Sequence, residues 1–341
     1  MKKIIILLGA GFAKYVKGLG TDEINQAFAD YNKWMIGDDT LYNYTKNILG
    51  KYYYDFNFET FLAVIENVCS YRLSQFREGK TSTSWKELSS TIFYLKDEFE
   101  LCPCLTDQVS SYEVLRSYIN LVIDNVSNYD DCTKCKKEID KFKKYIQYLK
   151  DHKYDVKIYS TNYDHIVPKA LGIFGTGLGV SNETMKHEFI YDIDGFRHLS
   201  LTYFSLHGSS YIYQEPYGRF YLSNIAQVMP FNVQSNRGGN PNTETFFTPI
   251  ISGYSKLEHI NGRPFNFGLQ TFANDCYDSA MIITMGYSYS DRHLNSIIET
   301  FSNCNIECIT LDTVPILPTP LNLRVNTNTN GIDDFLTNAV K

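Results

Sequence analysis

The sequence predicts an α/β protein with a Rossmann-like, doubly wound parallel sheet and a helical insertion. Short apolar runs rich in β-branched residues alternate with segments of helical periodicity, which is typical of parallel sheets. Two of these runs, residues 3–8 and 280–285, end directly in a glycine turn. In open α/β sheets, ligands bind outside the carboxyl ends of the strands, so the two turns also indicate a ligand site.

The expected core elements follow one another in chain order. Buried strands are expected at residues 3–8, 156–160, 280–285 and 306–311, and helices at 164–171, 267–277 and 294–303. Shorter strands are expected at 189–192 and 201–206, then a hairpin around 210–222 and a polar loop at 232–244. We expect a single domain over 1–341, with a core formed by 1–21 plus 151–341.

The remaining residues, 22–150, are expected to form a mostly helical insertion. Its helices are predicted at 55–78, 85–100, 106–125 and 135–150, from apolar side chains that recur with the 3.6-residue period. The block carries more aromatic side chains than an exposed appendage tolerates. We therefore expect it to pack over the ligand site or to form a subunit interface, with a self-contained helical core as the alternative.

Composition excludes several classes of protein. With 43% hydrophobic and 21% charged residues, the 341-residue chain is typical of globular proteins. A net charge of -6 gives no support for direct nucleic-acid binding, and we expect no membrane-spanning segment. The first apolar run ends before Gly9, so it is short for the apolar region of a signal peptide. Eight unevenly spaced cysteines do not suggest a disulfide framework, so we expect a cytoplasmic protein.

Two cysteine pairs raise the question of a zinc site. They are Cys102 with Cys104, and Cys132 with Cys135. The helix expected at 106–125 lies between the pairs and would separate them by about 30 Å. The pairs would then be unable to share one ion, and no metal is expected.

The first motif with chemical potential is the turn formed by Gly9, Ala10, Gly11 and Phe12. Glycines let a backbone approach a phosphate closely, and the helix that follows offers its N-terminal N–H groups. The full dinucleotide fingerprint with a third glycine is absent. A turn that is needed only for packing is the alternative interpretation.

The second motif, Thr161, Asn162 and Asp164, follows the strand at 156–160. The side-chain amide of Asn162 both donates and accepts hydrogen bonds, which suits a residue that holds a water molecule or a sugar hydroxyl. The alternative role for Asn162 or Asp164 is to cap the next helix.

The third motif places His207 before a glycine at the end of a strand. An imidazole is a suitable general base at neutral pH. A structural or exposed histidine is the alternative.

The fourth motif begins with Gly286, Tyr287 and Ser288, where hydroxyl groups follow another glycine turn. Hydroxyl groups in this position can bind a phosphate or a ribose. Asp312 follows the last expected strand, where an acidic residue can accept hydrogen bonds from ribose hydroxyls. A solvated loop acid is the alternative for Asp312.

These four motifs, in this order, resemble the sirtuin-like superfamily, and most closely its bacterial zinc-less branch from anti-phage defence systems. The similar segments are LLGAGFAK, STNYDHIVPKAL, SLHGS and IITMGYSYSDRHLNSII. The resemblance covers about 1–28 and 155–315, and it does not cover the helical block. Two departures stand out: Ala13 replaces a serine of many members, and no zinc ribbon with paired cysteines follows His207.

The resemblance implies an NAD site in which Asn162 and His207 match the catalytic asparagine and histidine of the family. It implies an NAD+ hydrolase that depletes NAD+ during infection and is held inactive otherwise. Homo-oligomerisation, or a partner such as a HerA-type ATPase or another defence protein encoded nearby, would supply that control. The alternatives are a zinc-less deacylase or ADP-ribosyltransferase, or a non-catalytic subunit that binds NAD or ADP-ribose.

Overall fold

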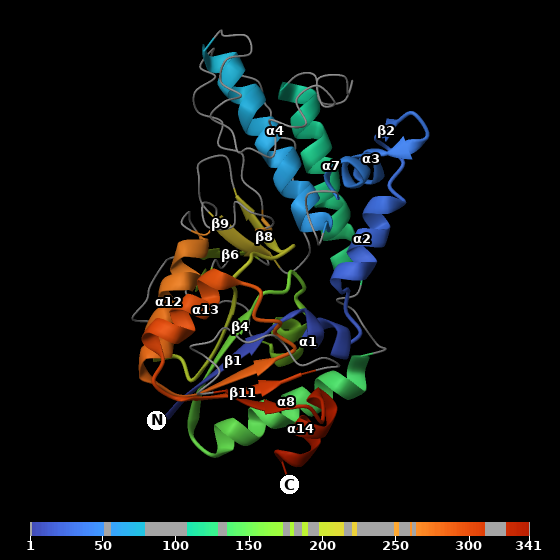
Figure 1. The fold of residues 1–341 in the computed structure, drawn as a ribbon. Coiled ribbons are helices and arrows are strands. Elements are labelled where there is room, and N and C mark those ends of the chain that lie inside the picture. The colour runs from blue at the N-terminus through green and yellow to red at the C-terminus, as the bar shows by residue number, and fades with distance from the viewer. Residues whose placement is uncertain are drawn as a thin grey trace.

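A six-stranded parallel sheet forms the centre of the computed structural model (Figure 1). The structure describes residues 2–50, 56–78, 108–128, 135–172, 178–180, 186–189, 198–214, 220–223, 249–251, 260, 264–310 and 325–340. The strands of the sheet are β1 (Lys2–Leu8), β4 (Tyr154–Ser160), β7 (Leu201–Ser205), β10 (Ser279–Met285), β11 (Asn305–Ile309) and β12 (Val325–Asn328). Every neighbouring pair in this sheet is parallel.

The strand order β12-β11-β10-β1-β4-β7 makes the sheet doubly wound. From β1 the chain moves outward through β4 to β7, then returns to the centre at β10 and moves outward the other way. This is the Rossmann strand order, and it confirms the predicted fold class. The winding direction reverses between β1 and β10, and ligands bind in the crevice at such a reversal.

Helices cover both faces of the sheet because the side chains of β1 alternate between two apolar layers. Ile4, Ile6 and Leu8 pack with α1 (Ala10–Tyr15), α8 (Lys136–Asp151), α9 (Ile166–Leu171) and α14 (Ile332–Asn338). Ile5 and Leu7 pack on the other face with α12 (Phe265–Asp278) and α13 (Arg292–Phe301). The apolar run of β1 is therefore buried on both sides, as the sequence predicts.

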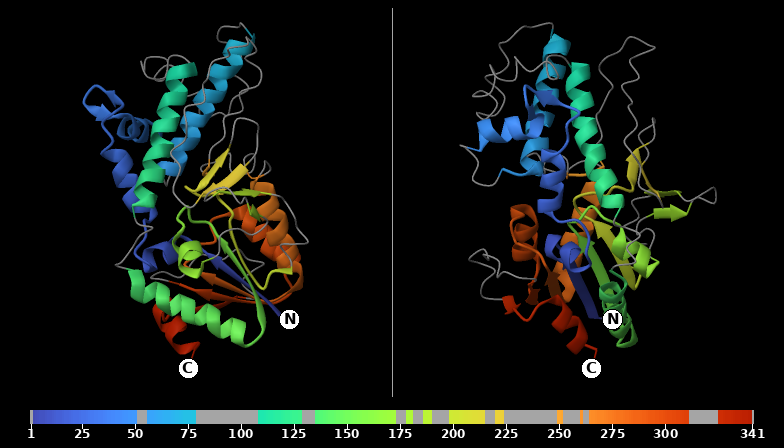
Figure 2. Two further views of the ribbon diagram at one scale, coloured as in Figure 1. Left: turned by 180° about the vertical axis from the view of Figure 1, so that it is seen from behind. Right: turned by 90° about the vertical axis from the view of Figure 1, so that its right-hand side faces the viewer.

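The helical block stands on the carboxyl-end edge of the sheet, away from both termini (Figures 1 and 2). Its described elements are α2 (Thr21–Ala29), β2 (Met35–Ile36), β3 (Asp39–Thr40), α3 (Leu41–Leu49), α4 (Phe58–Glu78) and α7 (Gln108–Ser127). The block has its own core, in which the ring of Phe28 contacts the rings of Phe61 and Tyr118. The sequence pattern groups 135–150 with this block, but α8 packs on the sheet instead.

A second, antiparallel sheet of four short strands lies beside α12 (Figure 1). It contains β5 (Leu178–Val180), β6 (Lys186–Phe189), β8 (Ile212–Gln214) and β9 (Phe220–Ser223), and β8 with β9 is the expected hairpin. The expected helix at 85–100, the loop at 232–244 and most of the strand at 189–192 lie outside the described residues. No helix within the described ranges combines the length and apolar character needed to cross a membrane.

Candidate functional site at the strand ends

A pocket of about 200 Å³ opens at the carboxyl ends of the central strands. The loops after β1, β4, β7 and β10 each contribute to it, through Ala10, Asn162, His207, Ser288 and Asp291. We call these segments, residues 9–12 (which include the first turn of α1), 161–164, 207–209 and 286–291, the floor of the pocket. The opposite wall comes from residues 19–24, 57–59 and 126, which we call the roof. Three of the four sequence motifs, and the Gly286 turn of the fourth, thus meet at one place.

The two glycine turns contact each other where the winding of the sheet reverses. The Gly9 N–H donates to the Met285 carbonyl at 3.0 Å, and the Gly11 N–H donates to the Gly286 carbonyl at 2.9 Å. Gly286 has φ +60°, and a Cβ there would overlap the backbone of residues 11 and 12. The glycines are therefore required for packing, whatever they also do for a ligand.

The turn after β1 uses several of its N–H groups inside the protein. The Phe12 N–H donates to the Gly9 carbonyl at 2.9 Å, and the Phe12 ring is buried against Phe142 with centroids 4.9 Å apart. Phe12 was predicted to contact a cofactor, but its side chain belongs to the core. Ala10 is the exposed residue of this turn and is the one that lines the pocket.

Asn162 is held against the first turn. Its side-chain Nδ2 donates to the Gly9 carbonyl at 3.0 Å, which leaves its Oδ1 as the acceptor for a ligand. His165 occupies the N-cap of α9, and Asp164 Oδ1 accepts the N–H of Ile166, the first helical residue, at 3.1 Å. Thr161 Oγ1 donates to the Leu8 carbonyl at 3.3 Å, so this hydroxyl also serves the protein itself.

His207 is buried, with 2% of its surface exposed, and its backbone is fixed on both sides. The Ile251 N–H donates to its carbonyl at 2.7 Å. Gly208 follows with φ +87°, where a Cβ would overlap the Pro249 carbonyl. The ring Nε2 of His207 lies 3.7 Å from Asp291 Oδ1. A carboxylate at this distance stabilises the protonated imidazole.

The turn after β10 offers less to a ligand than its sequence suggests. Tyr287 borders the pocket, but its hydroxyl donates to Asn295 Oδ1 at 3.0 Å, and burial raises the pKa of this phenol well above its usual value. Ser288 is exposed, and its Oγ lies 2.8 Å from Ser290 Oγ. Asp312, the remaining predicted contact, lies outside the described residues.

The roof meets the floor through a buried phenol. The Tyr163 hydroxyl lies 3.1 Å from Glu59 Oε1 and 3.1 Å from the Ile251 carbonyl. Burial raises the pKa of this phenol well above its usual value, and the charge of Glu59 raises it further. Glu59 itself lines the pocket, as does Asn57. Neither residue belongs to a sequence motif, because both are brought to the site by the tertiary packing of α4.

The charge of the pocket is negative. Glu59, Asp164 and Asp291 line it, and none of the described lining residues is Lys or Arg. A positively charged or neutral group is therefore favoured inside, and a phosphate is disfavoured there.

His165 shows what a structural histidine looks like in this fold. It is 1% exposed, its ring stacks on Tyr211 with centroids 4.4 Å apart, and burial lowers its pKa to about 3, with Lys169 as a second cause. Its imidazole is therefore neutral at physiological pH. His207, in contrast, borders the pocket beside a carboxylate.

No protein-family model and no curated protein matches the chain. Similar solved structures include two Sir2 homologues in complex with ADP-ribose, one with a serine-to-alanine and one with a histidine-to-asparagine substitution. Their sequence identities to this chain are 13% and 12%, and each has a TM-score of 0.46. Each alignment covers 99% of this chain, and 92% and 90% of the respective homologue. A third, described as the structural basis of sirtuin substrate affinity, is 11% identical with a TM-score of 0.40 and covers 99% and 92%. Structural similarities this weak do not support any conclusion about this chain.

Proposed function

We propose that the protein is an NAD+ hydrolase that cleaves the nicotinamide–ribose bond and releases nicotinamide and ADP-ribose. The observation that carries the proposal is the meeting of Asn162 and His207 with both glycine turns at one pocket of a doubly wound sheet. The order of the motifs, which resembles that of zinc-less sirtuin-like proteins, supports NAD+ as the substrate.

The charge and size of the pocket fit one end of NAD+. The nicotinamide ring is cationic in NAD+, and the pocket is lined by carboxylates. Its volume of about 200 Å³ is below the ~300–1,000 Å³ of most small-molecule sites, so it holds part of a dinucleotide. We place the nicotinamide and its ribose inside, with the pyrophosphate outside beside Ala10.

The floor then supplies the chemistry. The bond between the nicotinamide nitrogen and C1′ of the ribose breaks, and a water oxygen bonds to C1′. His207 takes the proton of that water, directly or through a ribose hydroxyl, and Asp291 stabilises the imidazolium that forms. Asn162, fixed by its bond to Gly9, holds the water or the ribose in place. The carboxylate of Glu59 favours the positive charge that develops on the ribose.

The biological role that we propose is the depletion of NAD+ in infected cells. Such an activity must be restrained in uninfected cells. We propose that assembly into a homo-oligomer, or binding to an ATPase or another defence protein encoded nearby, controls it. The order of the motifs supports this role.

The test is nicotinamide release from NAD+ by the purified full-length protein, alone and with the products of neighbouring genes. We expect His207→Ala and Asn162→Ala to lower the rate by about 10²- to 10⁴-fold, the contribution of general-base catalysis. The double variant should be little slower than either single one, because the two residues act on one step. His198→Ala, at an exposed histidine outside the pocket lining, is the matched control and should keep the wild-type rate.

Two results would refute the proposal. One is a folded His207→Ala protein that releases nicotinamide at nearly the wild-type rate. The other is a wild-type protein that releases none under any of these conditions. Release of nicotinamide without free ADP-ribose would instead identify a transferase.

A further inference from the structure

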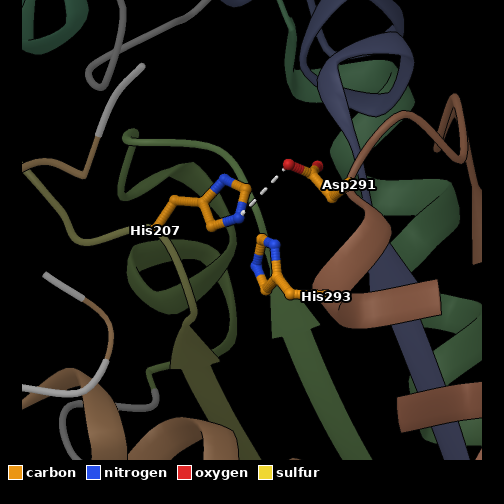
Figure 3. Close-up of side chains that lie close together, drawn as sticks. All are labelled: His207, Asp291 and His293. Atoms are coloured by element: carbon orange, nitrogen blue, oxygen red, sulfur yellow. Dashed lines mark ion pairs between the residues drawn. The ribbon is translucent and has the colours of Figure 1, made fainter. Parts of the chain in front are cut away.

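Two histidines and one carboxylate converge beside the pocket (Figure 3). His207 follows β7, whereas Asp291 immediately precedes α13 and His293 lies in its first turn. One ligand atom from each residue can be chosen so that all three lie within 4.8 Å of one another. The rings of His207 and His293 have centroids 5.5 Å apart, and Asp291 points toward the space between them.

The backbone around this cluster is held in place. The Asn295 N–H donates to the Asp291 carbonyl at 3.0 Å, and Asn295 Nδ2 donates to the Tyr289 carbonyl at 2.7 Å. On the other side, the bond from Ile251 fixes His207. The three side chains are therefore presented by rigid segments, which lowers the cost of bringing them together around a ligand.

The orientation of Asp291 is not explained by helix capping. An aspartate at the N-cap position usually accepts an N–H from the first turn of its helix. Asp291 occupies the N-cap of α13, but its side chain makes no capping hydrogen bond and lies beside His207. Its carboxylate is turned toward the two imidazoles.

The residue types select a class of cation. Two imidazoles and one carboxylate suit Zn²⁺, Co²⁺ or Fe²⁺, whereas Mg²⁺ and Ca²⁺ prefer oxygen ligands alone. Around Zn²⁺ the ligand atoms lie about 2.0–2.2 Å from the metal and therefore about 3.3 Å apart. The ligand atoms of the cluster lie within 4.8 Å of one another, so reaching this geometry requires each of them to move by roughly 1 Å, which rotation of the side chains can supply. Three protein ligands leave a fourth position for water.

We propose that His207, Asp291 and His293 bind one Zn²⁺-class cation, and that this cation inhibits the cleavage of NAD+. The second half of this proposal, the inhibition, rests on the proposed function of His207. A neutral imidazole has one N–H and only one basic nitrogen lone pair. A metal bound to that lone pair takes the electrons that the base needs to accept a proton, so the two roles of His207 exclude each other. The sequence predicts no metal, from the separation of its cysteine pairs. This proposal departs from that prediction, and none of those cysteines belongs to the cluster.

Binding is tested on the full chain, after removal of metals with a chelator, by calorimetric titration with ZnCl₂ and by Co²⁺ absorption spectra. We expect one ion per chain, and a Co²⁺ spectrum without thiolate charge-transfer bands. His293→Ala and Asp291→Asn should each weaken binding at least about tenfold, since even outer-shell changes cost about 10- to 100-fold. His198→Ala should bind like the wild type, and circular dichroism confirms that each variant is folded.

The site is refuted if one-to-one binding is absent, if it survives both substitutions, or if the spectrum shows thiolate ligands. Inhibition is tested by comparing nicotinamide release with and without Zn²⁺ within each variant. We expect Zn²⁺ to inhibit the wild type, a chelator to reverse this, and His293→Ala to lose the sensitivity. Binding without inhibition would overturn the second half alone. Absence of cleavage in every sample would overturn the proposed function, while the titration still decides the metal site.

Discussion

The floor and the roof of the pocket are held together by different forces. The floor segments and the strand ends that carry them are joined by backbone hydrogen bonds, such as those from the Gly11 N–H to the Gly286 carbonyl and from the Leu206 N–H to the Ser160 carbonyl. The roof belongs to an aromatic core and reaches the floor through the contact of Glu59 with Tyr163. Hydrogen bonds constrain direction as well as distance, whereas hydrophobic packing is non-directional. The floor therefore suits the chemistry, and the roof suits enclosure and electrostatic tuning.

The largest effect is expected from a change that breaks the floor. Gly286→Ala introduces a Cβ that overlaps the neighbouring turn and forces a side chain into the left-handed region. The conformation alone costs about 1–2 kcal/mol, and the overlap adds to it. We expect the free energy of unfolding to fall by more than about 3 kcal/mol, with loss of cleavage.

Gly37 offers a matched control for this change. It also has φ +60°, but no atom lies within 4 Å of the Cβ position. Gly37→Ala should cost only the conformational term, about 1–2 kcal/mol, and should leave the pocket intact. Equal losses for the two variants in denaturant unfolding would show that the contact between the turns contributes nothing.

The next effect concerns the charge of the roof. Glu59→Gln keeps the shape of the side chain but removes a negative charge from the pocket. We expect cleavage to slow about tenfold, less than the 10²- to 10³-fold supplied by a donor in direct contact with the reacting atoms. Asp38→Asn, an exposed acid in the hairpin of the same block, is the control. An unchanged rate in Glu59→Gln would limit the roof to enclosure.

An effect on stability rather than on rate should follow from cutting the link between roof and floor. Tyr163→Phe removes the hydroxyl that joins Glu59 to the Ile251 carbonyl. Removing one partner of a buried hydrogen bond costs about 1–3 kcal/mol. We expect the free energy of unfolding to fall by an amount in this range. Amide hydrogen exchange should accelerate more in α4 than in β1. Equal changes in both elements would show that roof and floor unfold as one unit.

The smallest effect is expected far from the pocket, at the exposed pair of Lys141 and Asp333, whose Nζ and Oδ1 lie 2.6 Å apart. The hydrogen bond from Lys141 holds the pKa of the Asp333 carboxyl below its usual value. Its stabilisation is thus present at neutral pH and is lost as the pH falls through that lowered pKa. Lys141→Met should cost at most about 1 kcal/mol at pH 7, with cleavage unchanged, and the difference in melting temperature should vanish in acid.

The contrast between floor and roof also explains which residues of the pocket can be predicted from the sequence. Asn162 and His207 each lie two residues after the end of a strand, and parallel strands end at a common edge, so their convergence is foreseeable. Glu59 reaches the pocket only through the packing of α4, and no local pattern carries that information. Similarly, α8 has the same periodicity whether it packs on the block or on the sheet.

Side-chain direction is the other limit of sequence reasoning. Phe12 and Tyr287 lie in turns that the sequence identifies, yet the ring of Phe12 and the hydroxyl of Tyr287 are directed into the protein. His293 lies beside a motif, and its proximity to His207 depends on the pairing of distant strands. The spacing of Asp291 and His293 at the start of a helix is the one local signal that points to this cluster.

The central claim is that the floor between Asn162 and His207 is where the nicotinamide–ribose bond is broken. A crystal structure of the His207→Ala protein with uncleaved NAD+ tests it most directly. We expect the nicotinamide ribose between Asn162 and position 207, the ring beneath Glu59, and the pyrophosphate beside Ala10. A dinucleotide bound elsewhere, or one with its adenine end in this pocket, would contradict the account.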